Sequence, residues 1–221
     1  MTHFVSDFEA LLVYHGPSST RSPATSMKQR CLQWIVMLAA ILLLSLPAGA
    51  ASTRYRGDVY LLRGFGDVFS EGLDQLGADF AKAGVPFKVV SHGNWRGVAT
   101  TIIANQKKSG PKPVVLIGHS LGANNAIRVA QRLKTAGIKV TWLVTLAATA
   151  PPLVPSNVRK VTNHYFSHGG WGAVVHPGPG FRGRLENIDH AGKAEIGHFN
   201  LDQQPAIQRA LLRRVKAIVR P

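Results

Sequence analysis

Cysteine is nearly absent from this chain, since Cys31 is the only one among 221 residues. A disulfide framework needs pairs of cysteines and a cysteine-ligated zinc site needs several, so the sequence excludes both. No group of histidines and acids shows the spacing of metal ligands either. We therefore expect no bound metal.

Acidic residues are also scarce, because 11 Asp and Glu stand against 26 Lys and Arg, a formal net charge of +15. A net charge of this size bears on possible binding partners more than on the fold. The first interpretation is a solvated basic surface with no partner, and the alternative is an anionic membrane surface as a partner. Nucleic acid is not expected, because the bases are scattered and no basic motif is interleaved with aromatic residues.

Long apolar runs are absent except for one, residues 31–47. It follows the basic segment 27–30 and precedes the small-residue site Ala48-Gly49-Ala50. This order is typical of a secretory signal peptide, so we predict an exported protein, periplasmic or extracellular. The alternative is an uncleaved anchor, because the run approaches the ~20 residues that a membrane span needs.

These segments divide the chain into three predicted parts. Residues 1–26 show no sustained periodicity and are interpreted as a mis-called N-terminal extension. Residues 27–50 form the signal peptide or membrane anchor. Residues 51–221 form the folded domain, for which 45% hydrophobic and 17% charged residues in the chain allow a sizeable core.

Short apolar segments alternate with amphipathic ones from residue 58 to the C-terminus. Near-continuous apolar strands separated by helices are typical of a parallel sheet covered on both faces. The predicted fold is an α/β three-layer sandwich with a mostly parallel sheet of about six strands and helices on both faces. The expected strands are 59–62, 87–91, 114–117, 140–146, 158–166 and 185–189, and the expected helices are 70–84, 95–108, 121–135 and 204–219.

One motif carries chemistry: Gly118-His119-Ser120-Leu121-Gly122 matches G-x-S-x-G. It lies between an apolar strand and a helix, the context that a nucleophile elbow requires. Small flanking residues allow the tight turn, and the serine hydroxyl is exposed at its apex. Ser120 is the predicted nucleophile, and the Leu121 N–H at the helix N-terminus is a predicted oxyanion donor.

A serine nucleophile needs a general base late in the chain, and His198 is the predicted one because it lies in a loop ahead of the final helix. His190 is the second candidate. The other oxyanion donor is expected in the loop after the first strand, at the N–H of Phe65 or Gly66. An ordinary glycine turn is the alternative interpretation of that loop.

Residues 116–124 and the Gly197-His198-Phe199 segment resemble the α/β-hydrolase superfamily, in particular small bacterial lipase- or esterase-like proteins. The resemblance loosely covers residues 59–221. It implies a reduced α/β-hydrolase fold and hydrolysis of carboxylic esters or thioesters through an acyl-enzyme. The implied substrate is an acyl ester or lipid, and the implied chemistry uses neither a metal nor an organic cofactor.

The triad acid is missing from its usual places, since similar proteins often carry an aspartate near Ala147. We predict Asp189 as the acid, because it ends a strand and precedes His198 by a short loop; Glu186 is the second choice. The alternatives are a Ser-His dyad and a non-catalytic or weakly active envelope binding protein.

The glycine-rich segment 167–184 is the remaining candidate feature. Its aromatic residues Trp171 and Phe181 are expected to line an acyl site or to cover it, unless the segment is an ordinary surface loop.

Overall fold

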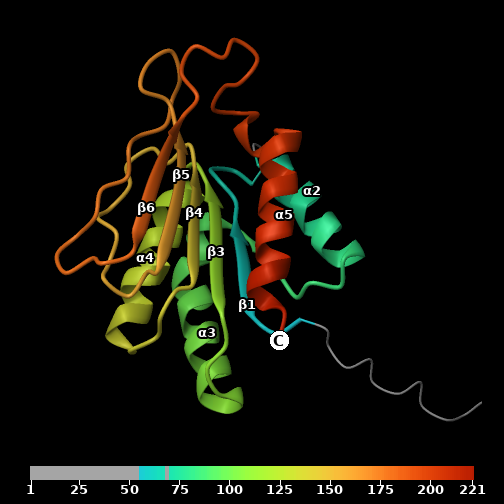
Figure 1. The fold of residues 1–221 in the computed structure, drawn as a ribbon, viewed down its shortest axis with the longest axis vertical. Coiled ribbons are helices and arrows are strands. Elements are labelled where there is room, and N and C mark those ends of the chain that lie inside the picture. Colours follow the sequence, from blue (N-terminus) through green and yellow to red (C-terminus); the bar gives the residue numbers. More distant parts are fainter. Residues whose placement is uncertain (1–54, 68–69) are drawn as a thin grey trace, which may run out of the picture. The chain divides into compact units, whose positions relative to one another are not determined.

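The computed structural model describes residues 55–67 and 70–221 (Figure 1). The interpretations of residues 1–26 as an extension and of residues 27–50 as a signal peptide or anchor lie outside the described residues. Residues 51–221 form a compact unit of their own. In the described part, none of the helices combines the length and the apolarity needed to cross a bilayer.

A six-stranded sheet lies at the centre of this unit, and all of its strands are parallel, in the order β2-β1-β3-β4-β5-β6. The predicted α/β fold with about six strands is therefore confirmed. The strands are β1 (Asp58–Leu62), β2 (Lys88–Val90), β3 (Val114–His119), β4 (Trp142–Leu146), β5 (Lys160–Tyr165) and β6 (Arg184–Asp189).

Burial explains why the central strands are apolar at nearly every position. β1, β3 and β4 are buried along their whole length, because helices cover both faces of the sheet. Figure 1 shows α2 (Glu71–Lys82) and α5 (Pro205–Val219) on one face, and α3 (Trp95–Ser109) and α4 (Leu121–Thr135) on the other. Each face holds its own hydrophobic core.

The strand order determines where a ligand site can form. The chain passes from β1 to β2 on one side and then crosses back to β3 on the other side of β1. Open parallel sheets bind their ligands at such a reversal, outside the carboxyl ends of the strands. In register, Leu62 of β1 lies beside Gly118 of β3, and His119 lies beside Leu146 of β4.

Two glycines let α4 approach the strands closely at this point. A Cβ added to Gly118 would lie 2.3 Å from the Gly122 carbonyl oxygen, and one added to Gly122 would lie 2.1 Å from the Leu62 carbonyl oxygen. Any side chain there would separate α4 from β1 and β3. The turn between β3 and α4 therefore depends on these two small residues.

Candidate active site

Ser120 occupies the turn between β3 and α4 in a strained backbone conformation. Its φ is 56° and its ψ is −123°, in a region that L-residues other than glycine seldom adopt. The Ser120 N–H donates to the Leu146 carbonyl at 2.9 Å, and its own carbonyl accepts from the first turn of α4. This geometry is that of the predicted nucleophile elbow, with Leu121 as the first residue of the helix.

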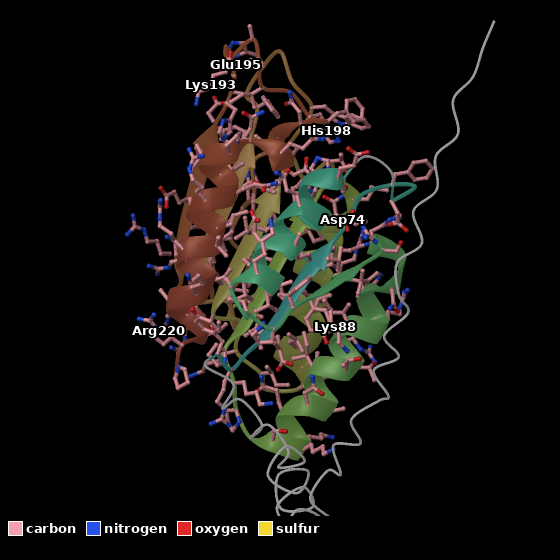
Figure 2. All side chains as sticks on the ribbon, turned by 90° about the vertical axis from the view of Figure 1, so that its right-hand side faces the viewer. Asp74, Lys88, Lys193, Glu195, His198 and Arg220 are labelled. Atoms are coloured by element: carbon pink, nitrogen blue, oxygen red, sulfur yellow. The ribbon has the colours of Figure 1, made fainter. Side chains whose placement is uncertain are left out.

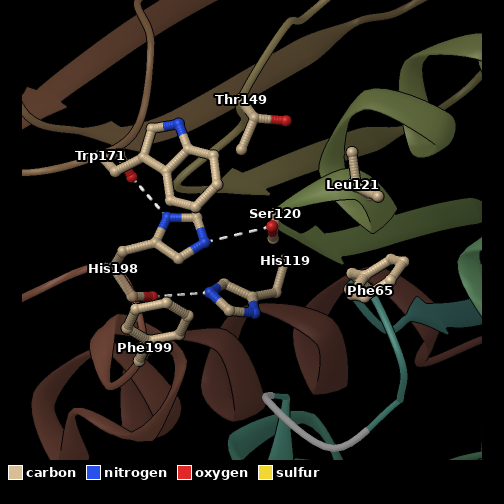
Figure 3. Close-up of a pocket in the computed structure, with 9 residues that line it drawn as sticks. Phe65, His119, Ser120, Leu121, Thr149, Trp171, His198 and Phe199 are labelled. Carbon is tan, nitrogen blue, oxygen red and sulfur yellow. Dashed lines mark hydrogen bonds between the residues drawn. The ribbon is translucent and has the colours of Figure 1, made fainter.

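His198 lies beside Ser120, with 3.1 Å between its Nε2 and the serine Oγ (Figure 3). Its other ring nitrogen, Nδ1, is 2.5 Å from the main-chain carbonyl oxygen of Trp171. A carbonyl can only accept, so Nδ1 carries the hydrogen and Nε2 offers its lone pair to the serine hydroxyl. This is the tautomer that a general base needs.

The indole ring of Trp171 also stacks on the imidazole, with ring centroids 4.7 Å apart and planes inclined by 26°. Burial lowers the pKa of His198, and the nearby His119 lowers it further. The hydrogen bond to Trp171 and the charge of Asp202 act in the opposite direction. The imidazole is therefore held neutral and oriented at neutral pH.

The structure does not bring Asp189 to His198, so the predicted triad acid is corrected. The Asp189 carboxylate is exposed at the end of β6 and accepts from the N–H groups of Ser167 and Ala191, at 3.0 and 2.9 Å. The side chain of Ser167 first, and then these N–H bonds, lower the pKa of Asp189 to about 2. Glu186, the second choice, lies 3.9 Å from Lys160. Neither carboxylate orients His198, because the Trp171 carbonyl occupies its Nδ1.

His190, the second candidate for the base, contacts another histidine instead of the serine. Its Nε2 lies 2.9 Å from Nδ1 of His164, and both rings are buried. Only one hydrogen fits between two such nitrogens, and burial lowers the pKa of both side chains. The pair bridges the ends of β5 and β6.

Asp202 is a buried carboxylate near the base that the sequence analysis did not single out. It is 1% exposed and faces the start of α2, yet neither side-chain oxygen has a hydrogen-bond partner among the described residues. Burial raises its pKa to about 6, although the amides of Gly72 and Leu73 oppose that shift. Asp202 therefore acts on His198 through its field and not through contact.

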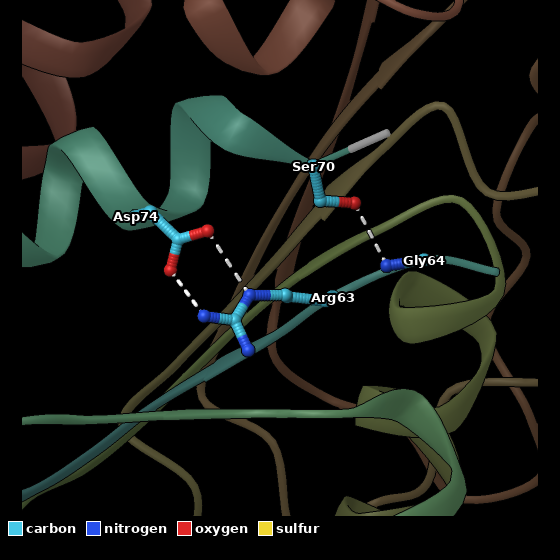
Figure 4. A network of polar contacts seen from close by, with 4 residues as sticks. All are labelled: Arg63, Gly64, Ser70 and Asp74. Carbon is cyan, nitrogen blue, oxygen red and sulfur yellow. Dashed lines mark hydrogen bonds and ion pairs between the residues drawn. The ribbon is translucent and has the colours of Figure 1, made fainter. Parts of the chain in front are cut away.

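His119, next to the nucleophile, connects two parts of the site. Its Nε2 lies 2.8 Å from the His198 carbonyl oxygen, and its Nδ1 lies 2.9 Å from Oγ of Ser70. Ser70 Oγ accepts from the Gly64 N–H at 2.8 Å (Figure 4). Since Nε2 must donate to a carbonyl, Nδ1 accepts from the serine hydroxyl, and the chain of three bonds has one consistent direction.

The loop after β1 passes directly beside Ser120, as predicted for the second oxyanion donor. A Cβ on Gly64 would lie 3.1 Å from the Ser120 Cβ. The Gly64 carbonyl accepts from Nδ1 of His92 at 3.0 Å, which holds the loop in place. Phe65 lines the pocket at Ser120 together with Leu121, whereas Gly66 does not.

An ion pair fixes the start of this loop to α2. Arg63, the residue after β1, binds the Asp74 carboxylate with two of its nitrogens (Figure 4). Bidentate pairing of this kind restrains both side chains. Two contacts thus fix the loop that carries Phe65: the ion pair of Arg63 with Asp74, and the hydrogen bond from the Gly64 N–H to Ser70 Oγ.

The pocket above Ser120 has a volume of about 320 Å³, and no lysine, arginine or carboxylate lines it. Its mouth carries three exposed aromatic side chains: Phe65 is 69% exposed, Trp171 58% and Phe199 55%. Of the two aromatics expected from segment 167–184, only Trp171 reaches the pocket. Phe181 is partly buried against the core under α3 and α4.

Metal-binding chemistry has no support in the geometry of the described residues. Residues 55–67 and 70–221 contain no group of three or more His, Cys, Asp or Glu side chains arranged to hold a metal ion. The chemistry available in this pocket is that of a hydroxyl, an imidazole and main-chain N–H groups.

Comparison with known proteins agrees with this geometry. The family model described as a thioesterase domain matches residues 81–164, which include Ser120. No curated protein sequence matches the chain.

One solved thioesterase shares the fold, and two further solved structures are similar at lower TM-scores. The type II thioesterase BorB from the borrelidin biosynthetic cluster aligns with a TM-score of 0.52 at 15% identity, covering 72% of this chain and 91% of that chain. A protein of the α/β-hydrolase superfamily from Xanthomonas campestris pv. campestris aligns at 18% identity and TM-score 0.40, covering 73% and 97%. The NocB thioesterase domain from the nocardicin cluster aligns at 15% and 0.45, covering 73% and 94%. The predicted resemblance is therefore confirmed: this chain has the α/β-hydrolase fold, and the segment that contains its elbow serine matches the thioesterase-domain family.

Proposed function

We propose that this chain is a serine hydrolase that cleaves acyl thioesters or carboxylic esters through an acyl-enzyme on Ser120. The observation that carries the proposal is the 3.1 Å approach of His198 Nε2 to the serine Oγ, with Nδ1 bound to a carbonyl. A strained serine, an oriented neutral base and two main-chain N–H groups are the parts that acyl transfer requires.

The reaction follows from these positions. His198 Nε2 takes the Ser120 proton as Oγ attacks the carbonyl carbon of the substrate. The N–H groups of Leu121 and Phe65 stabilise the negative oxygen that forms. His198 then gives its proton to the leaving thiol or alcohol, and water hydrolyses the acyl-enzyme with the same histidine as base.

The Trp171 carbonyl replaces the triad acid in this scheme. A carbonyl oxygen preserves the required tautomer, although it stabilises the imidazolium less than a carboxylate would. The uncharged pocket favours an apolar acyl group, and its volume of about 320 Å³ lies at the small end for ligand sites. We therefore assign a small acyl chain as the preferred substrate, whereas a bulky triglyceride exceeds the pocket.

The first test is labelling by a fluorophosphonate, which reacts only with an activated serine. The wild-type protein should form one adduct on Ser120, located by peptide mass spectrometry. Ser120→Ala should abolish labelling, and His198→Ala should slow it by orders of magnitude because the base is lost. Circular dichroism of each variant provides the folding control.

The alternative of a non-catalytic binding protein makes the opposite prediction. A folded wild-type protein that forms no adduct, or that is labelled equally well in the His198→Ala variant, would reject the proposed mechanism. If Ser120 is labelled, hydrolysis of matched acyl thioesters and oxygen esters of increasing chain length then defines the substrate class.

A further inference from the structure

A second and larger cavity lies far from Ser120, among the segments that precede the strands. Its volume is about 690 Å³, and its lining includes four cations and no carboxylate: Lys107, Lys112, Lys139 and Arg159. Partly buried Ile103, Ile138 and Ile218 add an apolar surface to the same cavity. We refer to it as the basic cavity.

The basic cavity opens at the opposite edge of the sheet from the active site. Lys112, Lys139 and Arg159 come shortly before β3, β4 and β5, whereas Ser120 follows β3. Because all the strands are parallel, their beginnings share one edge and their ends share the other. Figure 2 shows this axis, with His198 and Lys193 at one end of the molecule and Arg220 towards the other.

The cations of the basic cavity are not neutralised by their surroundings. No described carboxylate lies within 4.0 Å of any of the four. The C-terminal ends of α3, α4 and α5 border the cavity, and each helix end supplies about −0.5 of a charge. Three such ends offset less than half of the four full positive charges. The cavity therefore keeps a positive potential.

The acids of the fold lie mostly at the other edge. Asp58 is an exception, but it is buried and bound by Asn105 and Gln106. Glu186 faces Lys160. Six of the nine described acidic residues lie at strand ends, in the loops near the active site or at the starts of helices there: Asp67, Glu71, Asp74, Asp189, Glu195 and Asp202. The ninth, Asp79, lies late in α2 and pairs with Lys82. None of the nine lines the basic cavity.

The N-terminal end of the described chain enters the fold at the basic edge. Arg56 N–H donates to the Val219 carbonyl, and Asp58 N–H donates to the Pro113 carbonyl, a residue that lines the basic cavity. The segment that leads into β1 therefore passes beside the basic cavity.

We propose that the basic cavity is a docking site for the anionic headgroups of phospholipids at a membrane surface. Phosphate groups fit the cluster of amines and the guanidinium, and the isoleucines accept the adjoining glycerol and the first methylenes. Docking at this edge turns the active-site pocket away from the bilayer. The proposal does not depend on the activity assigned to Ser120.

The test measures binding of residues 51–221, a compact unit that contains both hydrophobic cores, to sedimented vesicles. Vesicles of phosphatidylcholine with phosphatidylglycerol should bind the protein, and vesicles of phosphatidylcholine alone should not. Replacing Lys107, Lys139 and Arg159 by Gln should weaken binding about 100-fold, at roughly a fivefold loss per base.

The matched control removes the same charge elsewhere. Arg209, Arg213 and Arg214 are exposed on α5, and their replacement by Gln should change binding only slightly. Equal losses in the two triple variants would overturn the proposal, because attraction would then come from the overall charge. Failure of the wild-type protein to bind anionic vesicles would overturn it as well.

A third arm separates a lipid surface from a soluble anion. Inorganic phosphate and glycerol phosphate at millimolar concentration should compete weakly with vesicles, because they lack the multiple headgroups of a surface. Saturation of the basic cavity by either soluble anion, with vesicle binding unaffected by the Gln substitutions, would identify a small-anion site and reject the membrane. Circular dichroism and ester hydrolysis should be unchanged in both triple variants.

Discussion

At the scale of single residues, the most unusual feature of the site is that a main-chain carbonyl orients the base. The Trp171 carbonyl orients the His198 imidazole, a role that a buried aspartate has in Ser-His-Asp hydrolases. The loss of an aspartate is most costly where the histidine adopts the wrong tautomer, and a carbonyl acceptor prevents that. The remaining deficit is electrostatic, because a neutral oxygen stabilises the imidazolium less than a carboxylate.

The position of the carbonyl can be tested through its neighbour, Gly172. A Cβ added there would lie 2.8 Å from the Cα of Ala147, so Gly172→Ala must displace the adjoining peptide. We expect kcat to fall about 100-fold, as for other displacements of ~1 Å in active sites, with little change in KM. Gly93→Ala, where a Cβ meets nothing within 4 Å, is the control. Unchanged kcat in Gly172→Ala would argue against a role for the carbonyl.

The lowered pKa of His198 makes a prediction for the pH profile. Burial disfavours the imidazolium, so the base is deprotonated at a lower pH than a histidine in water, whose pKa is 6.5. The acid limb of kcat/KM should therefore have an apparent pKa below 6.5, with activity rising as pH increases and then level. A limb centred at or above 6.5 would show that burial does not lower the pKa of His198.

At the scale of elements, the elbow is where β1, β3 and α4 meet with no room between them. Both glycines of the motif serve this packing, whereas the serine between them carries the chemistry. The close approach also fixes the N–H of Leu121 at the start of α4. Stability and catalysis therefore depend on the same contact.

The prediction for this contact is a stability measurement on Gly122→Ala. The added methyl would meet the Leu62 and Arg63 carbonyl oxygens at 2.1 and 2.4 Å, so α4 must shift away from β1. We expect the free energy of unfolding in urea to fall by at least the ~1–3 kcal/mol typical of overpacking. Gly93→Ala again provides the comparison, and a loss no larger than in that variant would contradict the packing argument.

The elements themselves were largely predictable from the sequence. All six strands and four long helices lie within a few residues of the predicted ranges, because apolar runs and helical periodicity reflect burial on this sheet. Ser120 was predictable because the elbow demands glycines at fixed spacing, and the structure places His198 beside it as expected.

The remaining parts of the site lacked a sequence signal. Acidic side chains are the usual third members of a triad and can be read from a sequence, whereas Trp171 contributes only a backbone atom. The hydrogen-bonded link from His119 through Ser70 to Gly64 was not predictable either. Ser70 and His119 are 49 positions apart, and only the strand order brings them together. Asp189 was chosen by its place along the chain, but its carboxylate caps the local turn at Ser167 and Ala191.

At the scale of the whole molecule, buried histidines and a buried carboxylate change the stability of the fold in opposite directions as the pH changes. Burial lowers the pKa of His119, His164, His190 and His198, so the unfolded chain takes up protons first on acidification and stability falls. Asp202 acts in the other direction. Its pKa is about 6 in the folded protein against 3.8 for the free side chain, so its ionisation destabilises the fold as pH rises across that window.

Asp202→Asn should separate these contributions. Relative to wild type, the variant should gain stability as the pH rises from about 4 to 6 and then keep that gain, up to about 3 kcal/mol. Below pH 4 the carboxyl is neutral in both states and the difference should vanish. Urea unfolding of both proteins at several pH values measures this, and a difference independent of pH would show that the carboxylate is not desolvated.

The carbonyl of Trp171 has a final consequence for how this enzyme can change over time. Every amino acid supplies a main-chain oxygen, so the acceptor of the His198 Nδ1 hydrogen survives any substitution at position 171 that keeps the loop in place. A substitution there removes the indole that stacks on the imidazole and leaves this hydrogen bond intact. The path of the loop, which side-chain identity does not record, is what keeps the imidazole oriented.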